Sequence, residues 1–226
     1  MRLVVITGGT KGIGAAIAKR FSDAGDRVVA LGHADLDVTR EDAVADVLGP
    51  IPVDVLVNNA GISTSAPVHK TTVDSWRAQL EVNATGAFLC TRAVLPGMRE
   101  RNRGRIVTVA STAGRVGAPY TAGYAASKHA ALGLMRTVAA VVAGTGVTAN
   151  AVCPTFVRTD MTARSVRRIV ESTGRSEQDS EAALVGPLGR LLEPEEVAFA
   201  VAFLAAPEAG SINGQTIVLD GGGIQA

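Results

Sequence analysis

The sequence lacks an excess of charge of either sign. It carries 22 lysine and arginine residues against 21 aspartate and glutamate residues, which leaves a formal net charge of +1 at pH 7. Binding to nucleic acid or to an anionic membrane surface depends mainly on concentrated positive charge. The charge balance therefore supports neither kind of partner, and we expect neither.

Cysteines and long apolar runs are also scarce. The only two cysteines, Cys90 and Cys153, each lie in an apolar stretch. Two buried thiols are typical of a reducing compartment rather than of a disulfide-linked secreted domain. The apolar run at residues 3–6 is shorter than a signal-peptide core, and no run approaches the ~20 residues of a membrane span. We therefore expect a cytoplasmic protein.

Aromatic residues make up only 4% of the chain, whereas 25 of its 226 residues are glycine. This composition favours the tight strand-to-helix turns of an α/β protein over an aromatic-rich β sandwich. The length predicts one large domain over residues 1–226, with enough apolar surface to form its own core. Trp76, His69 and His129 have no partner at metal-ligand spacing, so no metal site is expected.

Short β-branched runs alternate with longer helical patterns along the whole chain. The predicted strands are residues 3–6, 27–31, 53–58, 104–110, 147–152 and 215–219. The predicted helices are residues 12–25, 40–48, 72–99, 122–144 and 194–206. This order predicts a doubly wound, Rossmann-type parallel sheet with helices on both faces.

Two segments depart from the alternation. Only residues 32–39 separate the second predicted strand from the next helix, and a crossover to a parallel strand takes about a dozen residues. We therefore expect the third strand of a doubly wound sheet and the helix before it to be missing or vestigial. Residues 159–190 are polar and rich in Arg, Glu, Ser and Gly. They are either a surface excursion or, as we expect, a lid over the substrate.

A glycine-rich segment follows the first predicted strand. Residues 7–14 read Thr-Gly-Gly-Thr-Lys-Gly-Ile-Gly and open a helix. Glycine allows positive φ and close backbone approach, and the N–H groups at a helix N-terminus attract anions. An ordinary turn would use the same glycines, but this place in an α/β chain favours a dinucleotide-binding loop. Residues 58–61, Asn-Asn-Ala-Gly, close the third predicted strand, either as a simple turn or as a ligand-binding strand end.

A serine, a tyrosine and a lysine follow the fourth predicted strand. Ser111 ends that strand, Tyr124 comes thirteen residues later, and Lys128 lies four residues beyond Tyr124. Residues four apart share a helix face, so the Lys128 ammonium can lie beside the Tyr124 phenol and lower its pKa. Such a phenol can exchange a proton with an alcohol or carbonyl oxygen, which Ser111 can also hydrogen-bond. Alone, the Tyr-x-x-x-Lys spacing fits a solvated surface pair, but the upstream glycine loop favours catalysis.

With these motifs in this order, the sequence resembles the single-domain short-chain dehydrogenase/reductase family, and its ketoreductases in particular. The resemblance covers nearly the whole chain and rests on residues 7–14, 58–61, Asn83 in 82–86, Ser111, Tyr124, Lys128, 150–159 and 211–222. It implies that Tyr124 is the acid/base and that Ser111 orients the substrate carbonyl. It also implies that Lys128 holds the nicotinamide ribose and tunes Tyr124, while Asn83 keeps a proton-relay water in place. Read alone, Asn83 would be a structural amide.

The resemblance further implies a nicotinamide dinucleotide cofactor. The residues expected to contact it are Gly8, Thr10, Lys11, Gly12, Ile13, Gly14, His33, Asp37, Val38, Asn59, Ala60, Gly61, Tyr124, Lys128, Pro154, Val157 and Thr159. Two positions depart from the family pattern. Thr155 follows Pro154 where glycine is usual, and Val141 or Val142 replaces a common glutamate.

The end of the second predicted strand bears on the choice of cofactor. A carboxylate there accepts hydrogen bonds from a free ribose 2′-hydroxyl and repels a 2′-phosphate. The sequence instead has Gly32 and His33, and Lys11 and His33 could approach a 2′-phosphate. NADP(H) is therefore favoured over NAD(H). Asp35 is the counterargument, because the shortened loop could swing it toward the ribose.

These features predict an NAD(P)-dependent oxidoreductase that interconverts a ketone and a secondary alcohol, as a carbonyl or 3-oxoacyl reductase does. The alternative is a catalytically inert NADP-binding regulatory protein of the same fold, which would not need the four catalytic residues. Epimerisation or dehydration is a further possibility, although such family members usually have a larger C-terminal substrate region. The arginines of the expected lid either face solvent or attract an anionic thioester substrate: Arg164, Arg167, Arg168 and Arg175.

The predicted helices at residues 72–99 and 122–144 are rich in Ala, Val and Leu on more than one face. A helix that is apolar beyond one stripe needs a second packing partner. Members of the family commonly pair through two long helices as dimers or tetramers. We therefore expect a homotetramer or a homodimer.

Overall fold

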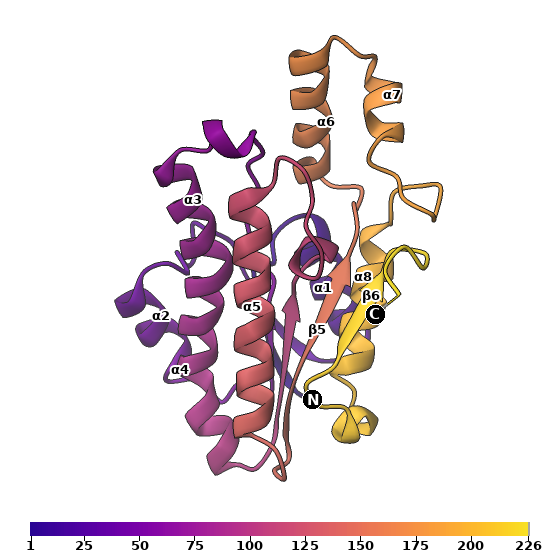
Figure 1. Cartoon of the computed structure of the whole chain (residues 1–226). Coiled ribbons are helices and arrows are strands. Elements are labelled where there is room, and N and C mark those ends of the chain that lie inside the picture. The colour runs from indigo at the N-terminus through magenta and orange to yellow at the C-terminus, as the bar shows by residue number, and fades with distance from the viewer. Residues whose placement is uncertain (226) are drawn as a thin grey trace.

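Six parallel strands form one sheet in the computed structural model, which describes residues 1–225 (Figure 1). In sheet order they are β2 (Arg27–Leu31), β1 (Leu3–Thr7), β3 (Val55–Asn58), β4 (Gly104–Val109), β5 (Val147–Pro154) and β6 (Thr216–Leu219). Every residue of β3 and β5 is buried, as expected for strands covered on both faces. The predicted doubly wound parallel sheet is confirmed.

Helices cover both faces of this sheet. They are α1 (Gly12–Asp23), α2 (Glu41–Leu48), α3 (Val73–Leu80), α4 (Gly86–Glu100), α5 (Ala122–Val141), α6 (Asp160–Thr173), α7 (Glu177–Ala182) and α8 (Pro194–Leu204). One apolar core lies between the sheet and α2, α4 and α5, and includes Leu56, Met98 and Leu132. The other lies beneath α1 and α8 and includes Ile17 and Leu204. No helix in residues 1–225 is long and apolar enough to cross a membrane.

The chain turns sharply after β2. The backbone N–H groups of Asp35 and Leu36 both donate to Gly32 O, at 3.1 Å and 3.0 Å, and α2 begins shortly afterwards at Glu41. No strand lies between β2 and α2, so β2 forms an edge of the sheet. The expected loss of a third strand and its helix is confirmed. The turn takes up the few residues between β2 and α2, so no further strand can form there.

The single helix predicted over residues 72–99 is wrong in detail. Between α3 and α4 the chain forms a π-helix over Glu81–Thr85, and Asn83 lies at its centre. The extra residue per turn changes the direction in which this side chain projects. Hydrophobic periodicity could not reveal the interruption, because apolar residues continue on either side of it.

Residues 159–190 contain two helices, α6 and α7, which form a hairpin projecting beyond the carboxyl end of β5, at the top of Figure 1. The Thr159 hydroxyl accepts a hydrogen bond from Thr162 N at 3.5 Å, and that of Ser176 accepts from Asp179 N at 3.1 Å. These side chains satisfy N–H groups that have no partner within the first turn of each helix. The polar composition of the segment thus reflects two short, capped, mostly exposed helices.

Candidate active site

A cleft of about 480 Å³ lies at the carboxyl ends of the central strands, where doubly wound sheets bind ligands. It brings together the glycine-rich loop, the segment after β3, Ser111 after β4, Tyr124 and Lys128 on α5, and the chain after β5. Thirteen of the expected cofactor residues line it: Gly8, Lys11, Gly12, Ile13, Gly14, Asn59, Ala60, Gly61, Tyr124, Lys128, Pro154, Val157 and Thr159. Thr10, His33, Asp37 and Val38 lie outside this lining.

The glycine-rich loop has the backbone geometry of an anion cradle. Gly8 and Gly12 have φ angles of +62° and +52°, which few other residues tolerate. A Cβ atom on Gly14 would lie 2.1 Å from Gly8 O, so no side chain fits there. The α1 N-cap residue, Lys11, makes no side-chain capping hydrogen bond, which leaves the first N–H groups of the helix free for a phosphate. These residues fit a dinucleotide.

Thr7 and Asn59 join this loop to the segment after β3. The Asn59 amide donates to Thr7 O at 3.0 Å and to Gly8 O at 2.9 Å. In return, Thr7 Oγ1 accepts hydrogen bonds from the backbone N–H groups of Asn59 and Ala60, both at 3.1 Å. The two cofactor motifs read from the sequence are thus one hydrogen-bonded unit.

Tyr124 and Lys128 share a face of α5, as their spacing predicts. The Lys128 ammonium lies 5.8 Å from the centre of the Tyr124 ring, and it donates a hydrogen bond to Val109 O at 2.9 Å. The net pKa of Tyr124 is nevertheless above that of an ordinary phenol. Burial raises the pKa of the Tyr124 phenol, against a smaller opposing effect of the neighbouring Ser111 side chain. Burial also lowers the pKa of Lys128 to about 8.

Asn83 supports the site from behind. Its side chain accepts a hydrogen bond from Ile62 N at 2.8 Å and donates to Ile62 O and to Ser127 Oγ, both at 2.9 Å. Ser127 Oγ in turn donates to Tyr124 O at 2.8 Å. Asn83 is therefore a buried link between the segment after β3 and the catalytic turn of α5, and it does not line the cleft.

The chain after β2 folds back toward the strand end, which is the alternative that the sequence leaves open for Asp35. Asp35, three residues beyond Gly32, turns back so that its carboxylate accepts a hydrogen bond from Gly32 N at 2.8 Å. A Cβ atom on Gly32 would lie 3.3 Å from this carboxylate and 2.9 Å from Thr10 Oγ1. The end of β2, the glycine-rich loop and Asp35 are therefore packed against one another at Gly32. His33 is exposed and packs into none of this.

Asp37 and Val38 lie deeper in the turn before α2. Asp37 Oδ1 accepts hydrogen bonds from Thr39 N and Thr39 Oγ1, which lower the pKa of its carboxyl. Val38 is buried against Gly86, where a Cβ atom would lie 2.6 Å from Val38 Cγ2. Both residues therefore have structural contacts of their own, outside the cleft lining.

Several cleft residues had no signal in the sequence. They belong to the segment after β3, the loop before α5 and the chain after β5: Ile62, Ser63, Ser65, Val116, Ala118, Pro119, Tyr120, Thr121 and Phe156. Thr155 and several residues of the expected lid also line the cleft. Of the four arginines in the expected lid, only Arg164 lines the cleft, while Arg168 donates a hydrogen bond to Ser63 O at 3.4 Å. Such residues meet only when loops from distant parts of the chain converge.

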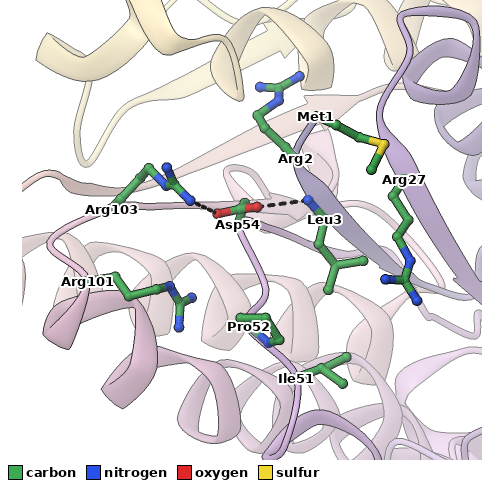
Figure 2. Close-up of a pocket in the computed structure, with 9 residues that line it drawn as sticks. All are labelled: Met1, Arg2, Leu3, Arg27, Ile51, Pro52, Asp54, Arg101 and Arg103. Carbon is green, nitrogen blue, oxygen red and sulfur yellow. Dashed lines mark hydrogen bonds and ion pairs between the residues drawn. The ribbon is translucent and has the colours of Figure 1, made fainter.

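A second pocket, of about 280 Å³, lies at the opposite end of the sheet (Figure 2). Its Asp54 carboxylate accepts hydrogen bonds from Leu3 N and from Arg103, both at 2.8 Å, and Arg101 donates to Val53 O at 2.8 Å. These contacts hold the amino ends of β1, β3 and β4 together. We assign them a structural role. No metal-binding cluster of His, Cys, Asp or Glu occurs within residues 1–225.

Comparison with known proteins gives consistent similarities. A family model described as enoyl-(acyl carrier protein) reductase matches residues 32–223. An acetoacetyl-CoA reductase of Shinella zoogloeoides is 39% identical over 243 residues, covering 98% of each chain. The 3-oxoacyl-(acyl-carrier-protein) reductase FabG of Vibrio cholerae is 35% identical over 244 residues, covering 98% of this chain and 96% of that protein. The structure of an actinorhodin polyketide ketoreductase variant with NADPH matches with a TM-score of 0.91 at 32% identity, over 98% of this chain and 96% of that one.

Proposed function

Because the chain belongs to the short-chain dehydrogenase/reductase family, we propose that it reduces a ketone, such as that of a 3-oxoacyl thioester, to a secondary alcohol. It is an NAD(P)-dependent oxidoreductase. The observation that carries the proposal is the convergence of Ser111, Tyr124 and Lys128 with the glycine-rich loop in one cleft. The relatives that match nearly the whole chain are named as reductases, which counts against the alternative of a catalytically inert, NADP-binding regulatory protein.

Each catalytic side chain has a task that follows from its surroundings. The hydroxyls of Ser111 and Tyr124 both reach the cleft, so a substrate carbonyl oxygen can accept a hydrogen bond from each. The raised pKa of Tyr124 keeps the phenol protonated at neutral pH, so it can donate its proton as the alcohol forms. Lys128, with a pKa of about 8, is still mostly positive at pH 7 and stabilises the phenolate left behind. The reduced nicotinamide, when bound, supplies the hydride to the carbonyl carbon.

The chain's own residues would hold the dinucleotide along the cleft. The N–H groups at the start of α1 would hold the pyrophosphate, and Lys128 would contact the nicotinamide ribose. We favour NADP(H) over NAD(H), because Lys11 is an exposed cation on the glycine loop, within reach of a 2′-phosphate. A polyketide ketoreductase structure of closely similar fold contains NADPH. Asp35 opposes this preference, because a carboxylate repels a 2′-phosphate.

Exposed apolar residues and buried thiols support a proposal for the assembly and the location of the protein. Phe88 on α4 and Val141 on α5 are large apolar residues with exposed side chains. Such residues on neighbouring long helices favour burial against a second copy, and we propose a homodimer or homotetramer. The two cysteines are free and buried, which fits a reducing compartment such as the cytoplasm.

A direct assay tests the proposed activity. The purified protein is given acetoacetyl-CoA with NADPH or NADH, and loss of reduced nicotinamide absorbance is followed together with formation of the hydroxy product. We expect reduction with both cofactors to depend on Tyr124. An equal, background rate for the wild type and the Tyr124→Phe variant across acetoacetyl-CoA, simple ketones and quinones would refute the proposal.

A further inference from the structure

Two non-glycine residues among the described ones have a positive φ, Asn102 at 47° and Tyr120 at 65°. In this left-handed region an L side chain crowds its own backbone, and a bulky residue there is a true outlier. Such strain persists only where the surroundings enforce it, and it gathers at functional sites. The two residues therefore need separate explanations.

Asn102 has a structural explanation. Its side-chain Oδ1 accepts a hydrogen bond from Gly146 N at 2.7 Å, which closes the connection between α4 and β4 against the start of β5. Asparagine also tolerates the left-handed region better than most residues. The fold therefore uses both the conformation and the side chain of Asn102.

Tyr120 has no such explanation within the fold. Its backbone is held in place: Tyr120 O accepts from Ala66 N at 2.8 Å, and Thr121 forms a parallel bridge to Ala66. Its side chain, however, is 63% exposed and forms no hydrogen bond with another residue in 1–225. The structure thus maintains a strained backbone and presents a large aromatic ring to solvent.

Tyr120 lines the cleft that also contains Ser111 and Tyr124. Three further large apolar residues line the same cleft while remaining exposed: Ile62 at 37%, Val116 at 43% and Phe156 at 38%. Val116 belongs to the same loop before α5, whereas Phe156 follows β5 on another wall. Exposed apolar groups that gather at one cleft mark the site of an apolar ligand.

We propose that Tyr120 is a specificity-determining residue that, together with Phe156, contacts the carbon skeleton of the substrate and favours a planar, aryl-fused ketone. This inference rests on the proposed ketone reduction in the same cleft. Aromatic rings stack on planar partners, and tyrosine has few rotatable bonds to immobilise on binding. A short, flexible 3-oxoacyl group would gain much less from the two rings.

The test compares α-tetralone, a planar bicyclic ketone, with acetoacetyl-CoA. Tyr120→Gly removes the ring and relieves the backbone, Tyr120→Phe keeps the ring, and Asn102→Gly is a matched change of a left-handed residue far from the cleft. We expect Tyr120→Gly to lower kcat/KM for α-tetralone by about tenfold, mainly through KM, because stacking and apolar contact are lost. The loss of kcat/KM on acetoacetyl-CoA should be several-fold smaller, because a short 3-oxoacyl group makes less contact with the ring.

Stability and binding separate this role from a structural one. Tyr120→Gly should keep or raise the Tm, since a glycine accepts the positive φ without strain, while Asn102→Gly should lower Tm and leave α-tetralone kinetics unchanged. Titration calorimetry with the product 1-tetralol tests binding without turnover, so it decides the inference even if the wild type reduces no ketone. Equal losses on both ketones, a lowered Tm in Tyr120→Gly, or 1-tetralol binding that ignores the substitution would each overturn the inference.

Discussion

The carboxylate of Asp35 accepts a hydrogen bond from the backbone N–H of Gly32, at 2.8 Å. Gly32 directly follows β2, the edge strand of the sheet, at the place where an acidic residue in dinucleotide-binding folds selects for an unphosphorylated ribose. Here the acid comes from three residues later, because the shortened connection folds back on the strand end. The structure thus brings the Asp35 carboxylate back to the end of β2, as the counterargument to NADP(H) requires.

Substitution of Asp35 tests how strongly it acts on the cofactor. Asp35→Asn keeps the shape and removes the negative charge, so repulsion of a 2′-phosphate is lost. We expect the KM for NADPH to fall about three- to tenfold, with the KM for NADH unchanged or higher. Steady-state kinetics with both cofactors measure this, and Asp23→Asn, in an exposed ion pair on α1, is the control. An unchanged ratio of the two KM values would show that Asp35 has no part in selection.

Removal of the Tyr124 hydroxyl should abolish most of the turnover. Tyr124→Phe retains the ring and its packing, so only the proton donor is lost, and general acid catalysis is worth about 10²–10⁴-fold. We expect kcat to fall by this factor while the dissociation constant of NADPH, measured by fluorescence titration, stays within about twofold. Tyr120→Phe is the matched control on the neighbouring loop. A wild-type kcat in the Tyr124→Phe variant would show that another group donates the proton.

Lys128 should make the protein less stable at neutral pH than at high pH. Burial lowers its pKa from 10.5 to about 8, so between these values the unfolded state binds more protons and stability rises with pH. Lys128→Met removes this term. We compare the change in the free energy of unfolding that Lys128→Met causes at pH 7 and at pH 10.5. We expect this change to be more stabilising at pH 7, by about 1–3 kcal/mol.

Urea unfolding of the wild type and of Lys128→Met at the two pH values provides the measurement. The hydrogen bond to Val109 O is lost at both, so the difference between them isolates the charge. Equal changes at pH 7 and pH 10.5 would show that the buried ammonium costs nothing.

Gly14 should tolerate no side chain, whereas Gly133 should. A Cβ atom at Gly14 would lie 2.1 Å from Gly8 O, so Gly14→Ala must displace the glycine loop; we expect a loss of about 3 kcal/mol or more in stability and of cofactor binding. Gly133, within α5, has nothing within 4 Å of the same atom. Gly133→Ala should therefore stabilise the protein by about 0.5–1 kcal/mol. Thermal unfolding and NADPH titration compare the two variants, and equal effects would contradict the steric reading of the loop.

Much of the site could be predicted because its information is local. The glycine-rich loop, the Asn-Asn-Ala-Gly strand end and the Tyr-x-x-x-Lys pair are each a short motif of a few consecutive residues. The parallel sheet brings the three motifs together at the carboxyl ends of its strands. The pKa of Tyr124 could not be predicted, because it depends on burial by segments distant in the chain. Helical spacing placed Lys128 beside Tyr124, but spacing says nothing of how much water remains around either group.

The sequence by itself determined the fold and the shortened connection after β2, because strand and helix periodicities and the length of a connection can be read from short segments. It also predicted a catalytic set, which the structure brings partly together in one cleft. Only the tertiary structure decided where Asp35 points, how Asn83 is held in a π-helix between Ile62 and Ser127, and that Tyr120 takes a left-handed conformation at the cleft. Each of these depends on contacts between segments far apart in the chain. A pattern of neighbouring residues does not specify such contacts, because they form only when distant segments pack together in the folded protein.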